Sequence, residues 1–285
     1  MSSFGVSPAF VFSRHTTAFT PADYVTSLPL IRELGFRFYQ PEIYFASAVS
    51  AWAEGGARAV QQAAADAGLR ASQFVAHLLM EGFSTRARLA AIDDDVTLFK
   101  RTAAIARQFP ACTVITVAMG PFQAESTDAV HPGWYEEQRQ RLADKIHACL
   151  AVATDAGLRL ALEIVPFSLL GNADGFLRLH AALGSPANLG VNLDTGHAWA
   201  GREIMEALPW KLSGRIFGTH LKDNNSDQHS ALAPGRGTIA WAPFLRALRA
   251  SGYTGSLDLE IACPADEVSA GYTAGLAHLR SLILN

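Results

Sequence analysis

The chain has 285 residues, of which 49% are hydrophobic and 17% charged, with 23 basic against 26 acidic side chains. This length fits either two ordinary domains or one α/β barrel of about 250 residues, and the low charge content excludes extensive disorder. No basic run suggests nucleic acid or an anionic membrane as a partner, and no stretch of about 20 apolar residues predicts a membrane span.

The three cysteines, Cys112, Cys149 and Cys263, share no metal-ligand spacing, and their odd number does not support a disulfide framework. The N-terminal residues lack the basic leader and apolar core of a signal peptide. We therefore expect a soluble protein in a reducing compartment, the cytoplasm.

Short apolar runs alternate with longer amphipathic ones along the chain. Several short runs are continuously apolar, which is typical of parallel strands buried on both faces. The predicted strands cover residues 9–13, 36–40, 72–79, 112–119, 159–165, 188–194, 215–222 and 255–261.

The longer runs predict helices over residues 21–34, 50–67, 86–109, 134–156, 173–183, 202–213, 241–251 and 267–284. Thr20 is a favourable N-cap and Pro21 suits the first helical position. A glycine followed by an apolar residue predicts a left-handed helix end at Gly35, Gly68, Gly157 and Gly252. Eight strands alternating with eight helices, without a linker, predict a single α/β domain over residues 1–285, a (β/α)8 TIM barrel.

Polar side chains at the C-terminal ends of barrel strands form the active site of a TIM barrel. The last four predicted strands each carry one such group near this end: Glu163, Asp194, His220 and Glu260. Side-chain alternation lets all four point into the barrel mouth. Three carboxylates there repel one another unless a cation holds them, and with one imidazole they suit Mn²⁺, Mg²⁺, Co²⁺ or Zn²⁺. The second predicted strand ends in two further polar residues, Gln40 and Glu42.

Three residues near the predicted mouth are candidates for binding the substrate. Lys222 could hold a hydroxyl, carboxylate or phosphate group, or it could pair with Asp194 or Asp223. His77 either lines the pocket or is a satisfied core histidine. Arg236 belongs to a glycine-containing turn and could close over the ligand.

Two further sets have a structural interpretation beside the functional one. Asp258, one layer below Glu260 on the same strand, is expected to be a paired structural group rather than a ligand. Three aromatic residues either form a sugar-stacking wall or pack in the core: Trp134, Trp199 and Phe167.

Five segments of the C-terminal half, taken in order, resemble the xylose isomerase-like TIM-barrel superfamily, and more narrowly its sugar phosphate isomerase/epimerase members. They are ALEIVPF, GVNLDTGHAW, FGTHLKDN, PGRGTIAWAPFL and GYTGSLDLEI, and the resemblance spans about residues 155–262. It implies that one divalent metal ion is bound by Glu163, Asp194, His220 and Glu260. It also implies that the two glutamates act as an acid/base pair and that His197 contacts a substrate oxygen.

The chemistry implied by this resemblance is proton transfer next to a carbonyl group. One glutamate removes the α-proton and the other returns a proton, while the metal polarises the carbonyl and stabilises the enediolate. The expected enzyme is a metal-dependent isomerase or epimerase of carbohydrate metabolism. Its substrate is a small keto or aldo sugar, or a related polyhydroxy carbonyl compound. The sequence leaves open whether the chain forms a homo-oligomer.

Three alternatives share the same scaffold. A dehydratase of a keto-inositol or dehydroshikimate type of substrate would use the same metal ligands, with loss of a β-hydroxyl. An apurinic endonuclease would add zinc sites through Asp194 and His197 and through Asp227 and His229, but it needs more upstream histidines than His77. A non-catalytic binding module is the third alternative.

Overall fold

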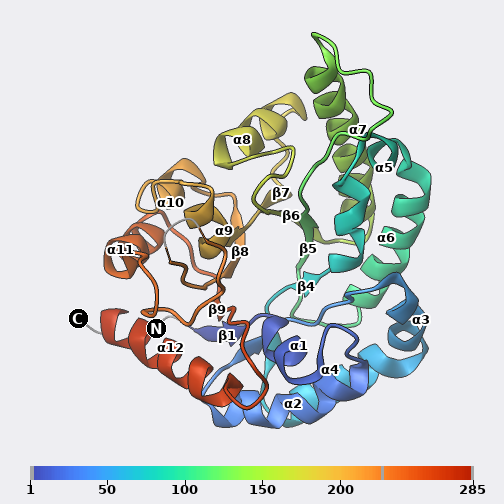
Figure 1. The fold of residues 1–285 in the computed structure, drawn as a ribbon. Coiled ribbons are helices and arrows are strands. Elements are labelled where there is room, and N and C mark those ends of the chain that lie inside the picture. The colour runs from blue at the N-terminus through green and yellow to red at the C-terminus, as the bar shows by residue number, and fades with distance from the viewer. Residues whose placement is uncertain (1–2, 226–227, 284–285) are drawn as a thin grey trace.

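The strands of this protein form a closed parallel ring that is surrounded by helices (Figure 1). The structure, a computed structural model, describes residues 3–225 and 228–283. Its strands are β1 (Phe4–Val6), β2 (Phe38–Tyr39), β3 (Arg70–Ala71), β4 (Phe74–Val75), β5 (Val114–Met119), β6 (Arg159–Ile164), β7 (Leu189–Asp194), β8 (Ile216–His220) and β9 (Leu257–Leu259). All pairings between these strands are parallel, so the predicted α/β TIM barrel is confirmed.

Two sheets share the ring. One has the order β3-β2-β1-β9 and the other the order β4-β5-β6-β7-β8. Single bridges close the ring between them, from Glu42 to Val75 and from Leu221 to Leu259. The strand predicted over residues 72–79 is interrupted at Ser72 and Gln73, which separate β3 from β4.

The prediction of a first strand over residues 9–13 is wrong. These residues begin helix α1 (Ala9–His15), and the strand that fills this place is β1, five residues earlier in the chain. A short, wholly apolar run fits a buried helix as well as a buried strand, so periodicity could not separate the two. Ser7 favours the helix, because its hydroxyl accepts a hydrogen bond from the backbone N–H of Ala9.

The other helices follow the predicted alternation with some breaks. They are α2 (Pro21–Glu33), α3 (Val49–Ala51), α4 (Ala57–Asp66), α5 (Arg86–Ala90), α6 (Ile92–Ala106), α7 (Trp134–Asp155), α8 (Ala173–Ala182), α9 (Thr195–Ala200), α10 (Leu208–Lys211), α11 (Trp241–Ala250) and α12 (Val268–Ile283). Shorter turns are η1 (Ala46–Ala48), η2 (Trp52–Gly56) and η3 (His77–Phe83). The helix predicted over 202–213 shrinks to α10, and α9 was not predicted. The helix predicted over 86–109 divides at Ala91, where the backbone leaves the helical region.

The helix ends predicted from capping residues are confirmed. Thr20 and Asp23 form a reciprocal capping box at the start of α2, with the backbone N–H of Thr20 donating to Asp23 across 2.7 Å. The glycines predicted to end helices all have positive φ angles: 96° at Gly35, 67° at Gly68, 66° at Gly157 and 88° at Gly252.

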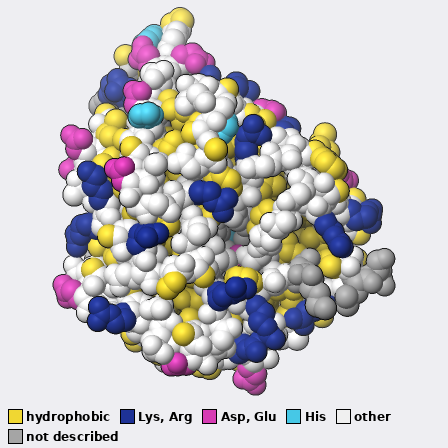
Figure 2. Space-filling model, turned by 180° about the vertical axis from the view of Figure 1, so that it is seen from behind, with side chains coloured by type: hydrophobic (Ala, Val, Ile, Leu, Met, Phe, Trp, Pro, Cys, Tyr) yellow, Lys and Arg dark blue, Asp and Glu magenta, His cyan; other side chains and the backbone are white. Residues whose placement is uncertain are grey.

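The surface seen in Figure 2 is mixed. Basic side chains are scattered over this face, acidic ones lie mainly toward its edge, and neither sign of charge forms one continuous patch. Among the described residues, no helix is both long and apolar enough to cross a membrane.

Candidate metal centre

Four polar side chains meet at the C-terminal ends of four adjacent strands. Glu163 lies near the end of β6, Asp194 ends β7, His220 ends β8, and Glu260 directly follows β9. Asp194 and His220 are register partners across β7 and β8, which places their side chains next to each other. The strands therefore bring these residues together although nearly 100 residues of chain separate the first from the last.

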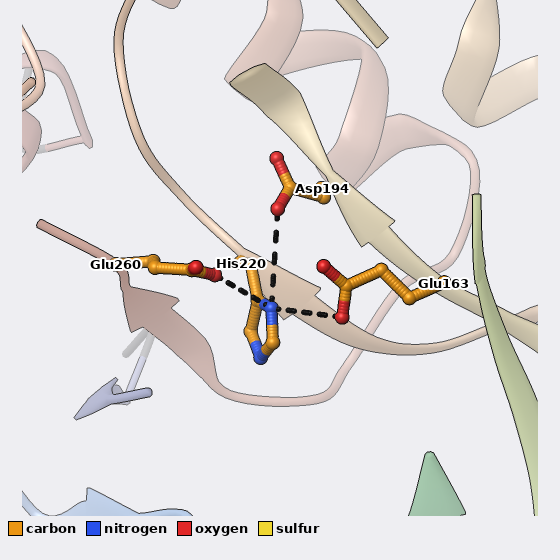
Figure 3. A group of neighbouring side chains, drawn as sticks. All are labelled: Glu163, Asp194, His220 and Glu260. Atoms are coloured by element: carbon orange, nitrogen blue, oxygen red, sulfur yellow. Dashed lines mark ion pairs between the residues drawn. The ribbon is translucent and has the colours of Figure 1, made fainter. Parts of the chain in front are cut away.

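The potential ligand atoms of these four side chains lie within 4.8 Å of one another. Nδ1 of His220 is 2.6 Å from Glu260, 3.2 Å from Glu163 and 3.9 Å from Asp194 (Figure 3). The three carboxylates thus surround one ring nitrogen. Among the described residues, this is the one group of three or more acidic, histidine or cysteine side chains with such a geometry.

The orientation of the His220 ring is set from behind by Gln40. The amide nitrogen of Gln40 donates to Asp258 across 2.7 Å, so its Oε1 atom is left to accept a hydrogen bond from Nε2 of His220, also at 2.7 Å. In the neutral ring, which is the form that binds a metal ion, this hydrogen bond places the proton on Nε2 and turns the lone pair of Nδ1 toward the carboxylates. Such outer hydrogen bonds are what fix a histidine as a metal ligand.

Asp258 is the paired structural group that the sequence suggested. Besides the Gln40 amide, its carboxylate accepts hydrogen bonds from the hydroxyls of Ser72 at 2.7 Å and Ser256 at 2.8 Å. Burial raises the pKa of Asp258, although these three hydrogen bonds act in the opposite direction.

The electrostatics of the cluster are dominated by burial and by the mutual attraction of its members. Burial disfavours the charged form of Glu163, but His220 and His197 outweigh it and hold the pKa of Glu163 well below its usual value. Burial is likewise outweighed at Glu260, where His220 and Lys222 lower the pKa to about 2. Burial prevails at Asp194 and raises its pKa. At His220, Glu260 and Glu163 overcome burial and raise the pKa well above its usual value.

A divalent cation fits this donor set. Within the described part of the chain, His220 Nδ1 and Glu260 Oε2 are buried and have no hydrogen-bond partner, whereas Asp194 Oδ2 faces the ammonium group of Lys222 at 2.7 Å. Nδ1 and Oε2 are 2.6 Å apart, yet the pair lacks hydrogen-bond geometry. Buried atoms with lone pairs that face one another need a positive charge between them. Three carboxylate oxygens and one imidazole nitrogen suit a hard or borderline divalent ion.

Lys222 lies inside this cluster. Its Nζ atom is 2.7 Å from Asp194 Oδ2, 3.2 Å from Glu260 Oε1 and 3.3 Å from His197 Nε2, and the residue is 1% exposed. Asp194 and Glu260 raise the pKa of Lys222 against the opposing effect of burial. Of the two pairings considered from the sequence, the structure contains the one with Asp194. Asp223 instead accepts hydrogen bonds from other parts of the chain, including Trp241 Nε1 at 2.8 Å.

The other predicted substrate-binding residues lie at different distances from the cluster. Nδ1 of His197 is 3.2 Å from both Glu163 and Asp194, and its backbone N–H donates to Asp194. His77 belongs to η3 rather than to a strand, and its ring stacks on Tyr44 with centroids 3.8 Å apart. Arg236 is exposed on the loop before α11, and its side chain is not brought into the cluster.

Two residues of the site were not assigned a role from the sequence. Gln40 orients His220, and Glu42 is a buried carboxyl group whose Oε2 atom has no hydrogen-bond partner among the described residues. Burial raises the pKa of Glu42 well above its usual value, and Glu260 and Glu163 add to this effect. The available signal was the position of Gln40 at the end of a predicted strand and of Glu42 just after it.

The remaining candidates are dispersed. Phe167 is 86% exposed, whereas Trp134 and Trp199 are partly buried, so these three do not share one environment. Of the residues that an apurinic endonuclease would use for extra zinc ions, Asp227 lies outside the described residues. His229 is described, and its ring centroid lies 4.6 Å from that of His197.

Comparison with known proteins gives a family and a set of similar folds. A family model described as xylose isomerase-like TIM barrel matches residues 28–282. The solved structure of the 3-keto-D-glucoside 4-epimerase YcjR from E. coli has a TM-score of 0.75 at 16% identity, with 99% of this chain and 100% of that chain covered. No curated protein shows significant sequence similarity to the chain.

Two other solved structures are similar to the same degree. The IOLI protein with a bound zinc atom has a TM-score of 0.76 at 15% identity, covering 99% of this chain and 98% of that chain. D-psicose 3-epimerase, solved in the presence of D-fructose, has a TM-score of 0.76 at 16% identity, covering 99% of each chain. At these identities the likeness establishes the shared barrel fold.

Proposed function

Because the chain belongs to the xylose isomerase-like TIM-barrel family, we propose that it is a divalent-metal-dependent isomerase or epimerase of a keto or aldo sugar, or of a related polyhydroxy carbonyl compound. One observation carries the proposal. The carboxylates of Glu163 and Glu260 approach the same atom, Nδ1 of His220, from opposite sides (Figure 3). Two carboxylates placed in this way can serve the two faces of one substrate carbon.

The proposed metal ligands are Glu163, Asp194, His220 and Glu260. When bound, the ion would supply positive charge that makes a proton next to the carbonyl more acidic. The identity of the ion is left to measurement among Mn²⁺, Mg²⁺, Co²⁺ and Zn²⁺. That the IOLI protein holds zinc in a similar barrel supports a divalent ion here.

The proposed proton transfer uses the two glutamates in sequence. A carboxylate oxygen of one glutamate takes the α-proton, and the electron pair of the broken C–H bond moves into the enediolate. In epimerisation, the other glutamate returns a proton to the same carbon from the opposite face. In isomerisation, the proton is returned to the neighbouring carbon. His197, next to Glu163, would donate a hydrogen bond to a substrate oxygen.

Substrate recognition is proposed for three further residues. Lys222 and His77 lie beside the cluster, and Arg236 would reach the substrate from its loop. That two similar folds belong to sugar epimerases supports a small sugar-like substrate. We also propose a cytoplasmic location, in keeping with three cysteines that are all free thiols.

The proposal is tested by hydrogen exchange between substrate and solvent. The metal-loaded protein is incubated in D₂O with a panel of ketoses and aldoses, and each sugar is analysed by NMR and mass spectrometry. We expect deuterium at one carbon next to the carbonyl of at least one sugar, together with its epimer or isomer. A product lighter by one water molecule would instead identify a dehydratase.

Matched variants connect the exchange to the two glutamates. Glu163→Gln and Glu260→Gln should each abolish formation of the epimer, and the double variant should abolish exchange, because an amide can neither accept nor return the proton. Glu137→Gln, on the exposed surface of α7, should exchange as the parent protein does. Exchange that survives both site substitutions would refute the mechanism with two carboxylates.

A further inference from the structure

The side chain of Lys222 occupies a place that a cation could hold. Its Nζ atom is surrounded by Asp194 Oδ2, Glu260 Oε1 and His197 Nε2, at 2.7, 3.2 and 3.3 Å. These groups, two carboxylates and an imidazole, are themselves potential ligands for a divalent ion. His229 packs against His197 and would supply a fourth such group at this end of the cluster.

The segment from Asp194 to His197 is shaped around this lysine. Asp194 and His197 contact the ammonium group. The hydroxyl of Thr195 accepts a hydrogen bond from the backbone N–H of Lys222 and donates one to its carbonyl oxygen. A Cβ atom at Gly196 would lie 2.6 Å from Cγ of Lys222, so the glycine leaves the room that the aliphatic stem occupies. Four consecutive residues therefore hold Lys222 in position, which makes its place a built feature of the site.

The charge of Lys222 affects how many divalent ions the centre can hold. Glu163, Asp194 and Glu260 carry three negative charges when ionised, Lys222 carries one positive charge, and His220 is neutral when it binds a metal ion. One divalent ion then brings the centre to neutrality, and a second divalent ion would have to displace the ammonium group. A buried site with an uncompensated charge is costly, so neutrality favours one ion.

We propose that Lys222 acts as a built-in cation that takes the place of a second metal ion and so limits this centre to a single divalent ion. The proposal rests on the proposed metal centre. Removing the ammonium group should open a second metal site between Asp194, His197 and Glu260.

Metal stoichiometry measures this directly. Wild-type protein and the variant Lys222→Met are dialysed to equilibrium against the same concentrations of free Zn²⁺, and bound zinc is counted by elemental analysis. We expect the wild type to saturate at one zinc per chain and Lys222→Met at two. Lys211→Met is the control, because Lys211 is also paired with carboxylates, those of Asp174 and Glu203, outside this cluster. It should bind one zinc.

The outcomes separate this inference from the proposed function. One zinc in both the wild type and Lys222→Met would overturn the role of Lys222 while leaving the metal centre in place. Two zincs in the wild type would also overturn it, and this measurement does not depend on the variant folding. A wild type that binds no divalent ion would contradict the metal centre itself, and with it this inference.

Discussion

The amide oxygen of Gln40 accepts a hydrogen bond from Nε2 of His220, although 180 residues separate the two in sequence. Gln40 in turn donates a hydrogen bond from its amide nitrogen to Asp258. The three side chains therefore form a chain of hydrogen bonds in which His220 donates to Gln40 and Gln40 donates to Asp258. The first of them, His220, is left with Nδ1 free of hydrogen bonds and directed at the carboxylates. The barrel interior thus selects which nitrogen is available to a metal ion.

Gln40→Met should weaken metal binding. The thioether cannot accept the hydrogen bond as the amide does, so the ring loses both its orientation and its preferred tautomer. Loss of an outer hydrogen bond of this kind lowers metal affinity by about 10–100-fold. Competition with a chromophoric chelator measures the change. Gln138→Met, at another fully buried glutamine in α7, should leave the affinity unchanged, and an equal effect at both positions would refute the assigned role of Gln40.

Lys145→Met should destabilise the fold. Lys145 Nζ donates to the carbonyl oxygens of Gly82 and Arg88, each at 2.7 Å, and forms an ion pair with Asp95. Removing the ammonium leaves the buried carboxylate of Asp95 with only the exposed Arg88 as a cationic partner, at 3.5 Å, and breaking a buried ion pair costs about 3–5 kcal/mol. Urea unfolding gives the change in the free energy of unfolding. Lys211→Met, which breaks exposed pairs with Asp174 and Glu203, should cost at most about 1 kcal/mol.

His77→Phe tests whether this residue binds the substrate. Phenylalanine keeps an aromatic ring to stack on Tyr44 but removes the ring nitrogens. Loss of one hydrogen bond to an uncharged substrate corresponds to about a 2–10-fold rise in KM. Steady-state kinetics with a sugar that undergoes exchange would give KM and kcat, and metal content should not change. Unchanged KM would assign His77 to packing alone.

The thiols of Cys112 and Cys149 should be unreactive in the native protein. Burial raises the pKa of each to about 12, so both stay protonated at pH 8. Because the folded state favours the neutral thiol, the contribution of these thiols to the free energy of unfolding is fully present below about pH 9. It is lost as the pH rises toward 12. Alkylation followed by mass spectrometry should modify the half-buried Cys263 first and all three cysteines in denaturant. Fast native labelling of Cys149 would contradict its burial in α7.

The candidate ligands could be located from the sequence because each lies at or just beyond the end of an apolar strand, and the alternation of side chains along a strand decides which of them face the barrel mouth. Glu163 and Asp194 needed no knowledge of distant contacts to be placed at neighbouring strand ends. Gln40 could not be assigned its role in this way. The role of Gln40 depends on its contact with His220, which joins the end of β2 to the end of β8. These two strands belong to different sheets, and no local sequence pattern encodes how far one is shifted along the barrel axis relative to the other.

Lys222 illustrates the same limit. Strand parity turns it inward, but both Asp194 and Asp223 were available as partners. The choice between these partners depends on the spacing between β7 and β8 and on the loop that follows β8. In this loop the carboxylate of Asp223 accepts hydrogen bonds from the backbone N–H groups of Gly235 and Ile239. The prediction of a strand over residues 9–13 was wrong for a different reason, because a short apolar run is compatible with either a buried strand or a buried helix.

The ring of strands is divided where β8 meets β9: one backbone bridge, from Leu221 to Leu259, crosses this seam, together with hydrogen bonds between the hydroxyl of Thr219 and the backbone of Ser256 and Asp258. Asp194 and His220 stand on one side of it and Glu260 on the other. A divalent ion bound by both sides, as proposed, would have to be released before the seam could part, and occupancy of the site would then be linked to opening of the barrel. Amide hydrogens along β9 would then exchange with solvent more slowly in the loaded protein, and the ion would act on the lifetime of the closed ring as well as on its chemistry.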